Sequence, residues 1–419
     1  MDVKSAESKS RAIKVLIGSI IIVAISYGTM NVQSLYIAPI CAQTGAELTQ
    51  VSLLFSVITA ASAIGGLVAA VLIEKIPMRI LLYFGTACYV LFFVCLYFAD
   101  SLPLVYLGAV FYGLCQVFVG FTTLQPLVTW WHAKDTAKKV SFLSIGMKLA
   151  AVILSPTIVW FLSNVGYDGT LLFNGGVLGV VMLLAVIFLT SNKPESYGLV
   201  AWGHEESADT DHAAGEPEGI SAKQAMRTLP FWAVLLASIL ISIPVAGFVT
   251  NAAVIFQSCG FDDSGAGIMI SVFSALSIAT VFIYGALTDK FGTRLANMSF
   301  TIASIVCVAG FLVTDGMVAA VFISLAGAVL SAYSGMIAAV TFGPLFGSRA
   351  IGPLVSVGLV ACGVGSTIAP PVASSIFTST GSYWGFMAIS LVICFVVLVL
   401  LLAATSKKSF ERVAAIKPE

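Results

Sequence analysis

The sequence predicts an all-α membrane protein with twelve transmembrane helices in two similar six-helix bundles. Three observations predict this class: the composition, the length and number of the apolar runs, and the placement of the basic residues. Of 419 residues, 59% are hydrophobic and 10% are charged, and the mean hydropathy is +1.04. A soluble domain carries about 25% charged residues, and a globule of this size has too little interior to hide so much apolar surface.

The apolar runs have the length of membrane-spanning helices. A helix needs about 20 apolar residues to cross the hydrocarbon core of a bilayer. Twelve such runs lie at 14–39, 51–73, 80–99, 103–128, 138–163, 169–190, 231–256, 265–288, 295–313, 317–342, 350–377 and 383–404. They lack the alternation of barrel strands, and backbone groups in lipid must bond within their own segment. We therefore expect helices, with the first run spanning the membrane and not cleaved as a signal peptide.

Basic residues occur on one side of the predicted topology. With the N-terminus inside, the inner segments hold nineteen of the twenty Lys and Arg residues: Lys4, Lys9, Arg11, Lys14, Lys75, Arg79, Lys134, Lys138, Lys139, Lys193, Lys223, Arg227, Lys290, Arg294, Arg349, Lys407, Lys408, Arg412 and Lys417. The outer loops hold none. This bias places both termini in the cytoplasm, in a multi-pass protein of the inner (cytoplasmic) membrane.

The chain divides into two halves that repeat one another. We predict an N-terminal bundle at 1–190, an acidic cytoplasmic linker at 191–229 and a C-terminal bundle at 230–419. Charged residues after the second span recur 215 positions later after the eighth, and Ser155-Pro156 recurs as Ala369-Pro370 at an offset of 214. Repeats of six spans are a known transporter architecture, in which the substrate site lies between the halves.

One loop carries a recognisable signature. The stretch Gly285-x-x-x-Asp289-Lys290-x-Gly292-x-Arg294 resembles the signature loop of the major facilitator superfamily, and a degenerate copy with Ala70, Glu74 and Pro77 follows the second span. The resemblance implies the major facilitator fold and a conformational latch between helix ends, although a plain surface ion pair of about 0–1 kcal/mol is the alternative. The latch candidates are Glu74, Lys75, Arg79, Asp289, Lys290 and Arg294.

Shorter stretches resemble the oxalate:formate antiporters and monocarboxylate porters. These are the segment 225–232 that opens the seventh span, Leu35-Tyr36-x-x-Pro39, and Trp130-Trp131 before a basic loop. The chain departs from that group at Val281 and Gly358, where the resemblance places an arginine and a lysine. Divalent oxalate is therefore not the expected substrate.

Lys148 is the only Asp, Glu, Lys or Arg that the sequence places well inside a span. A lysine at the centre of a membrane helix costs about 2.5–3.5 kcal/mol by insertion scales, so such residues usually serve the transport pathway. We expect Lys148 to contact an anionic substrate. The alternatives are a neutral lysine and a side chain that extends into water without a specific partner.

Other polar residues in the spans are candidates for lining the substrate site, because the resemblance places their helices around the cavity. They are Asn31, Gln33, Ser34, Tyr36, Tyr112, Gln116, Asn251 and Tyr333. For each of them, hydrogen bonding between helices is as good an explanation as ligand contact.

These observations predict a transporter of a small organic anion, a monocarboxylate, that works by rocker-switch alternating access as an antiporter, symporter or facilitator. Two other functions remain open: a carrier or exporter of a neutral or cationic compound, and a transporter-like sensor. No constellation of enzymatic residues, metal site or cofactor motif is recognised. We expect a monomer in contact with membrane lipid and no nucleic acid, and it stays open whether Cys41 and Cys259 pair.

Overall fold

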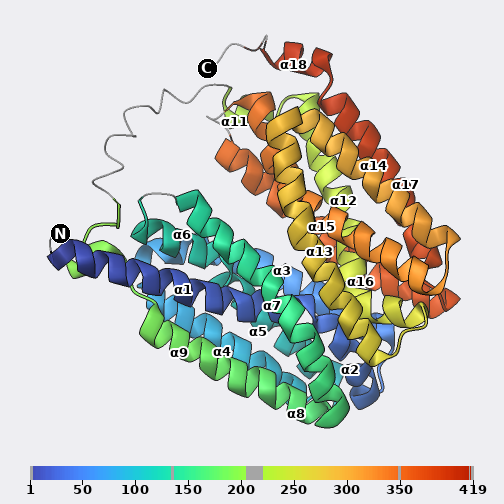
Figure 1. Cartoon of the computed structure of the whole chain (residues 1–419), viewed down its shortest axis with the longest axis horizontal. Coiled ribbons are helices and arrows are strands. Elements are labelled where there is room, and N and C mark those ends of the chain that lie inside the picture. The colour runs from blue at the N-terminus through green and yellow to red at the C-terminus, as the bar shows by residue number, and fades with distance from the viewer. Residues whose placement is uncertain (1–2, 134–135, 204–219, 348–350, 415, 417–419) are drawn as a thin grey trace. The chain divides into compact units, whose positions relative to one another are not determined.

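The fold was examined in a computed structural model that describes residues 3–133, 136–203, 220–347, 351–414 and 416. The chain divides into two compact units, Met1–Ala214 and Gly215–Glu419, which are coloured blue to green and yellow-green to red in Figure 1. Twelve helices of the described chain are long and apolar enough to cross a membrane. The predicted fold class, an all-α membrane protein with twelve spans, is therefore confirmed.

The first unit contains six spans, three of which are built from more than one helical segment. Its elements are α1 (Val3–Asn31), η1 (Gln33–Tyr36), α2 (Ile37–Thr44), α3 (Leu48–Lys75), α4 (Met78–Tyr97), α5 (Leu102–Phe118), α6 (Phe121–Trp131), α7 (Thr136–Asn164), α8 (Gly166–Leu172), the π-helical turn η2 (Phe173–Leu178), α9 (Gly179–Leu189) and η3 (Pro194–Tyr197).

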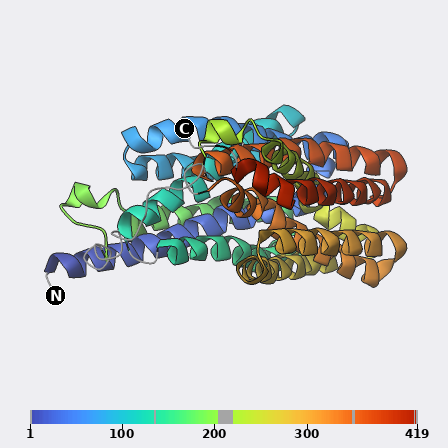
Figure 2. The same cartoon turned by 90° about the horizontal axis from the view of Figure 1, so that it is seen from above.

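The second unit contains six spans, each of which is a single long helix. Its elements are α11 (Ala222–Ala225), α12 (Leu229–Ser258), α13 (Asp263–Phe291), α14 (Thr293–Val313), α15 (Gly316–Phe346), α16 (Ile351–Thr380), α17 (Trp384–Ala404) and α18 (Lys407–Ala414). Figure 2 shows the helices of both bundles from a second direction.

Helices pair in the same order within each unit. In the first unit α1 packs on α7 and α9, α3 on α5, and α4 on α5 and α9. In the second unit the corresponding pairs are α12 with α16 and α17, α13 with α15, and α14 with α15 and α17. The sequence repeat therefore corresponds to a repeat of packing.

Small residues allow the closest of these helix pairs to form. A Cβ at Gly28 of α1 would lie 2.7 Å from the Cβ of Ala150 on α7. In the second unit a Cβ at Gly365 of α16 would lie 2.3 Å from the carbonyl oxygen of Ile239 on α12. Helices in lipid associate through packing of this kind, because burial of apolar surface gives no advantage there.

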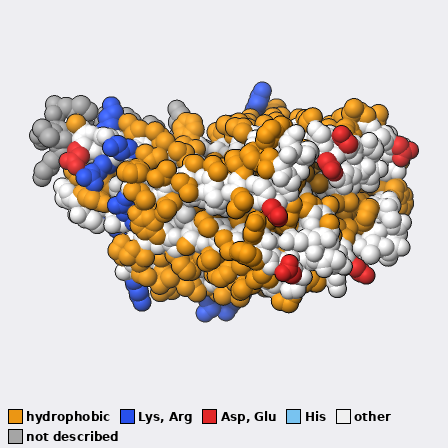
Figure 3. Space-filling model, turned by 90° about the horizontal axis from the view of Figure 1, so that it is seen from below, with side chains coloured by type: hydrophobic (Ala, Val, Ile, Leu, Met, Phe, Trp, Pro, Cys, Tyr) orange, Lys and Arg blue, Asp and Glu red, His pale blue; other side chains and the backbone are white. Residues whose placement is uncertain are grey.

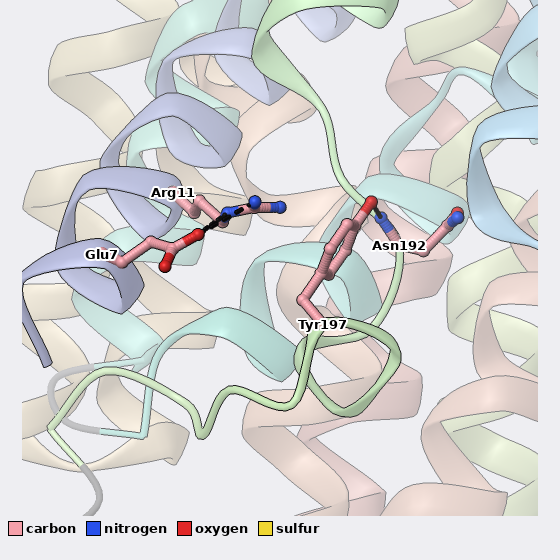
Figure 4. A network of polar contacts seen from close by, with 4 residues as sticks. All are labelled: Glu7, Arg11, Asn192 and Tyr197. Atoms are coloured by element: carbon pink, nitrogen blue, oxygen red, sulfur yellow. Dashed lines mark hydrogen bonds and ion pairs between the residues drawn. The ribbon is translucent and has the colours of Figure 1, made fainter. Parts of the chain in front are cut away.

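The segment after α9 folds back over one end of the first bundle, and residues 192–203 are called the strap below. The Trp131 indole donates to the carbonyl of Asn192 (2.9 Å), and the Trp202 amide donates to the carbonyl of Trp131 (3.0 Å). The Ser8 hydroxyl donates to the carbonyl of Val200 (2.6 Å). These bonds tie the strap to α1 and α6, so this part of the predicted linker belongs to the first bundle. Figure 4 shows Asn192 and Tyr197 of the strap near Arg11 of α1.

The far end of the predicted linker belongs to the second unit in the same way. The Ile220 amide donates to the carbonyl of Phe346 at 3.1 Å, and Ile220 is buried. Ser221 caps the short helix α11, where its hydroxyl accepts a hydrogen bond from the Gln224 amide. Residues 204–219, which carry most of the acidic side chains, lie outside the described residues.

Hydrophobic side chains cover much of the surface that the structure describes. On the face drawn in Figure 3 they form a broad cover with few charged side chains among them. Many large apolar residues are more than half exposed, among them Leu67, Phe188, Leu229 and Val360. An exposed apolar surface of this extent is expected of helices that face lipid.

Candidate functional site

The first span is broken near its C-terminal end, and the predicted run at 14–39 gave no sign of this break. Helix α1 ends at Asn31, the tight turn η1 follows, and α2 resumes at Ile37. Pro39 explains the break, because proline has no N–H to donate to the carbonyl four residues earlier and its ring crowds that carbonyl. Broken helices of this kind line substrate and ion sites in membrane transporters.

Three candidate residues lie on the turn η1, and all three are buried with unused hydrogen-bonding atoms. Gln33, Ser34 and Tyr36 are each 2% exposed. The Gln33 amide oxygen and nitrogen, the Ser34 hydroxyl and the Tyr36 hydroxyl have no partner in the described part of the chain. A buried polar atom without a partner costs about 1–3 kcal/mol, so these atoms are expected to bond to water or to a ligand.

The Tyr36 ring has a defined aromatic environment. It meets Phe93 of α4 and Tyr167 of α8 edge to face, with ring centroids 6.4 Å away in both cases. The Tyr167 hydroxyl and the Asn174 side-chain oxygen are also buried without a described partner, and Asn174 lies in the π-helical turn η2. Sequence reasoning missed Tyr167 and Asn174, and π-helical turns, which often mark functional sites, have no simple sequence signal.

The fourth span is broken as well, at Gly120 between α5 and α6. A Cβ at Gly120 would lie 1.7 Å from the carbonyl oxygen of Gln116, so only glycine fits there. Tyr112 and Gln116, two turns and one turn before the break, both donate to the carbonyl oxygen of Ser26 on α1, at 2.6 Å and 3.3 Å. The Gln116 side-chain oxygen has no described partner. Both candidates therefore lie against the first span and one of them keeps a free acceptor.

Asn31, the last residue of α1, lies next to the break in the first span. Its side-chain nitrogen donates to the carbonyl of Tyr27 one turn earlier at 2.9 Å. That bond turns the Asn31 side chain back onto its own helix, since Tyr27 lies one turn earlier on α1. Asn31 therefore has a structural role, whatever its part in ligand contact.

Lys148 lies near the middle of α7, twelve residues after Thr136 and sixteen before Asn164. Gly146 and Ala150 face α1, since Cβ positions at Gly146 and Gly28 would touch Ile20 and Ala150. Lys148 is two residues from each of them, or about 200° around the helix. It therefore projects from the opposite side of α7. It is half-buried, and its ammonium group has no hydrogen bond or ion pair within the described chain.

Asn251, the candidate on the seventh span, has all its bonding capacity used inside the second bundle. Its side-chain nitrogen donates to the carbonyl of Gly247 (3.0 Å) on the same helix. Its side-chain oxygen accepts from the Ser374 hydroxyl of α16 (3.0 Å) and from the Tyr383 hydroxyl (3.1 Å) just before α17. The residue joins three segments of the bundle.

Tyr333, the candidate on α15, belongs to a second hydrogen-bonded network within the second bundle. Its hydroxyl accepts a hydrogen bond from the Thr301 hydroxyl at 3.0 Å, and its ring lies edge to face with Tyr284. Tyr284 in turn donates to the Asn297 side-chain oxygen, and the Asn297 nitrogen donates to the Thr341 hydroxyl at 2.9 Å. The structure places Tyr333 among polar groups that tie α13, α14 and α15 together.

The five latch candidates whose side chains the structure describes form no ion pair among the described residues, where the one salt bridge joins Arg11 to Glu7. Asp289, Lys290 and Arg294 are exposed at the junction of α13 and α14. Gly292 between these helices has φ +81°, a conformation that side chains other than glycine rarely adopt,. The tight junction therefore explains the glycine, and the latch remains a prediction.

In the first-unit copy of the loop, Arg79 forms hydrogen bonds with the end of α9 and with the residue Asn192 that follows it. Its guanidinium donates to the carbonyl of Ile187 in the last turn of α9, and its amide donates to the Asn192 side-chain oxygen at 3.2 Å. A cation at the C-terminal end of a helix stabilises the unpaired carbonyls there. Lys75 is exposed, and the side chain of Glu74 lies outside the described residues.

His132, the residue after α6, lies buried beneath the strap. Its Nδ1 is 2.9 Å from the carbonyl oxygen of Val128, so Nδ1 carries the proton, and Nε2 has no described partner. Burial lowers the pKa of His132, the bond to the Val128 carbonyl opposes this, and Lys139 lowers it further. No group of three or more His, Cys, Asp or Glu side chains able to hold a metal ion occurs among the described residues.

Twelve apolar helices in two bundles of matching packing order define a multi-pass membrane protein, and broken spans with buried polar atoms are features of transporters. The sequence comparison agrees: residues 19–350 match the model of the Major Facilitator Superfamily. The chain belongs to this superfamily of transporters. A search of curated proteins finds no significant match.

Solved structures support the same fold. A bacterial homologue of the human lysosomal transporter Spinster, in an inward-facing and unoccupied conformation, matches with a TM-score of 0.74 and 16% identity over 96% of this chain and 98% of that one. The occupied inward-facing form of that homologue matches with a TM-score of 0.70 and 16% identity over 96% of each chain. A mutant of the nucleoside transporter NupG matches with a TM-score of 0.70 and 12% identity over 94% of this chain and 99% of that one.

Proposed function

We propose that this transporter carries a small organic anion, a monocarboxylate, across the inner membrane by alternating access of its two bundles, with both termini in the cytoplasm. The observation that carries the proposal is Lys148, a charged side chain near the middle of a span with no described partner. A central lysine is unfavourable in lipid by about 2.5–3.5 kcal/mol. A substrate carboxylate would supply the missing counter-charge.

The surroundings of Lys148 on α7 fit this role. Its side chain projects away from the packed α1 face, and Ser144, one turn earlier on the same side of the helix, is exposed. The single positive charge of the Lys148 ammonium group would neutralise the single negative charge of one carboxylate. This explains our preference for a monocarboxylate over a dianion.

The rest of the substrate would meet the polar atoms at the two helix breaks. Gln33, Ser34, Tyr36 and Gln116 keep unused donors and acceptors in the first bundle. These groups are neutral, so they would orient a substrate by hydrogen bonds and not by charge. We prefer exchange or facilitated flux to proton symport, because no Asp or Glu lies near the centre of a described span to relay protons,.

A direct binding experiment tests the proposal. Purified protein should bind a monocarboxylate from a panel of carboxylates saturably, which raises its melting temperature as RT ln(1 + [L]/Kd). Lys148→Ala should lose this effect and keep the fold, because it removes an unfavourable charge. Lys14→Ala, which removes an exposed lysine in the first half of α1, is the matched control. Undiminished carboxylate affinity in Lys148→Ala would refute the proposal.

A second candidate function is transport of a neutral, hydrogen-bonding solute. The observation that favours it is that the unused atoms of Gln33, Ser34, Tyr36 and Gln116 are all uncharged. In that case neutral polar solutes would stabilise the protein, carboxylates would not compete with them, and Lys148→Ala would leave binding unchanged. Uptake into liposomes separates either carrier from a sensor that binds without translocation.

A further inference from the structure

A group of buried polar atoms lies around the break in the first span and continues onto the sixth span. Its members are Gln33, Ser34 and Tyr36 of η1, Tyr167 of α8 and Asn174 of η2, and they are called the η1 group. Each of these side chains has at least one buried oxygen without a hydrogen-bond partner in the described part of the chain. The function proposed above uses only the residues of η1 and does not say which groups of the substrate they meet.

The side chains of the η1 group follow one another in space. In a 3₁₀ turn, side chains three positions apart lie on the same face, so Gln33 and Tyr36 project together. The ring of Tyr36 meets that of Tyr167 with the centroids 6.4 Å apart. Asn174 follows Tyr167 after about two helical turns and therefore lies on the same face of the sixth span,. Phe93 of α4 borders the group, since its ring meets that of Tyr36 edge to face.

The free atoms of the η1 group need hydrogen-bond donors. The Asn174 side-chain nitrogen donates to the carbonyl of Thr170 at 2.9 Å, which leaves the side-chain oxygen free, and an amide oxygen can only accept. The Gln33 amide oxygen has the same requirement,. A carboxylate brings only acceptors and an alkyl chain brings neither. A ligand that satisfies these oxygens must therefore carry O–H or N–H groups of its own.

Charge and bonding capacity select between the two kinds of donor. All members of the η1 group are neutral side chains, and no Asp or Glu lies near the centre of a described span. An amino group would arrive as an ammonium ion, and an unpaired charge is costly to bury. A hydroxyl is neutral, and its single oxygen can donate to an amide oxygen and accept from a tyrosine hydroxyl. Hydroxyl groups therefore fit the η1 group best.

We propose that the η1 group binds hydroxyl groups of the transported anion, so that the substrate is a polyhydroxylated monocarboxylate. This inference rests on the function proposed above, in which Lys148 holds the carboxylate. More than one hydroxyl is needed, because the free oxygens of Gln33 and Asn174 come from different spans and each requires a donor. Water offers the same O–H chemistry, and the experiments below separate the two sources.

Two acids of equal chain length test the proposal. Gluconate carries a hydroxyl on every carbon beyond the carboxylate, and hexanoate carries none. Calorimetry on the purified full chain should show gluconate binding about tenfold more tightly or better. Tyr36→Phe and Tyr167→Phe keep the rings and remove the free hydroxyls, so each should weaken gluconate binding about fivefold and leave hexanoate binding unchanged. Both variants should fold, because the hydroxyls that they remove have no described partner.

The matched control is Tyr97→Phe, which removes a phenol hydroxyl at the end of α4, outside the η1 group. It should leave the affinity for both acids unchanged. Equal affinity of the wild type for gluconate and hexanoate would overturn the proposal. Equal losses of gluconate affinity in Tyr97→Phe and Tyr36→Phe would also overturn it, because the effect would then not belong to the η1 group.

Sorbitol, an uncharged counterpart of gluconate, keeps this test apart from that of Lys148. Sorbitol binding that is weakened by Tyr36→Phe and unchanged by Lys148→Ala would support the hydroxyl site even if the carboxylate site failed.

Hydroxyl-radical footprinting separates substrate from water, since radicals formed from bound water label the rings beside it. Saturating gluconate should protect Tyr36 and Tyr167 from labelling and leave Tyr97 unchanged. Unchanged labelling of Tyr36 would overturn the proposal, because only water would then meet the η1 group.

Discussion

The two bundles share one packing order but differ in how their buried polar groups are satisfied. Among described side chains, ten buried nitrogen and oxygen atoms have no hydrogen-bond partner, and all ten belong to the first unit. In the second unit the polar side chains of α12 to α17 bond to one another, as Asn251 and Tyr333 show. The first unit also contains the broken spans and Lys148.

This difference suggests a division of labour between the repeats. Unsatisfied buried groups destabilise a fold by about 1–3 kcal/mol each, so a protein keeps them where water or a ligand completes the bonds. Saturated networks instead make a bundle rigid and specify its packing. We therefore expect ligand recognition to be concentrated in the first unit, with the second unit acting as a frame.

The largest expected effect is at Lys148, and its mirror position tests the asymmetry. Loss of a charge-assisted contact worth about 3 kcal/mol lowers affinity about 100-fold, so Lys148→Ala should lose measurable anion binding. The repeat relates Lys148 to Cys362 on α16, whose thiol is directed at the carbonyls of Ser238 and Ser334. Adding Cys362→Lys to Lys148→Ala should not restore binding by calorimetry. Restored binding would show that either repeat can hold the anion.

The next effect separates ligand contact from helix association. Asn251→Ala should lower the free energy of unfolding by about 1–3 kcal/mol, because the Ser374 and Tyr383 hydroxyls lose their acceptor, and should leave ligand affinity unchanged. Gln33→Ala should lower ligand affinity and leave the free energy of unfolding nearly unchanged, because the Gln33 amide has no described hydrogen-bond partner that the substitution would leave unpaired. Thermal unfolding and ligand titration of both variants measure this. Equal stability losses would contradict the division between the units.

A smaller effect is expected in the signature loop. Asp289→Asn should slow transport several-fold and leave binding nearly unchanged, because an exposed residue at a helix junction biases conformations without touching substrate,. Glu74→Gln should have less effect, since its loop lacks the glycines of the second copy. Counterflow rates and equilibrium binding in liposomes distinguish the two quantities. Normal turnover with lost affinity in Asp289→Asn would argue against a latch.

The smallest effect is the dependence of stability on pH, and it too belongs to the first unit, which holds all three histidines. Burial lowers the pKa of His132 in the folded protein below its ordinary value of about 6.5. The unfolded chain therefore takes up the proton first, and stability falls as the pH drops below that value. Melting temperatures at pH 7.5 and 5.5 should differ less in His132→Gln than in the wild type. His204→Gln is the control, and an equal loss of pH dependence there would exclude His132 as the cause.

Much of the architecture could be predicted from the sequence. Twelve apolar runs, the repeat of Glu74, Lys75 and Arg79 at an offset of 215, and the one lysine inside a span are properties of the linear chain. The cost of polar backbone in lipid leaves helices as the solution for such runs. The signature at Gly285 to Arg294 predicted the superfamily, and the family comparison confirmed it.

Only the tertiary structure decided which candidate side chains have hydrogen-bond partners and which do not. Gln33 and Asn251 are both amides inside apolar runs, and nothing in the sequence distinguishes them. Yet Asn251 meets Ser374 and Tyr383, residues more than 120 positions away, while Gln33 lies on a turn where its amide meets no described partner. The strap is a similar case. In the sequence Trp202 belongs to a polar linker, and only the folded chain brings Trp131 and Lys139 beside it. Hydrophobicity acts on each segment by itself, whereas a hydrogen bond or a ring contact needs a second group at a defined distance and angle, and only the packed helices supply that group.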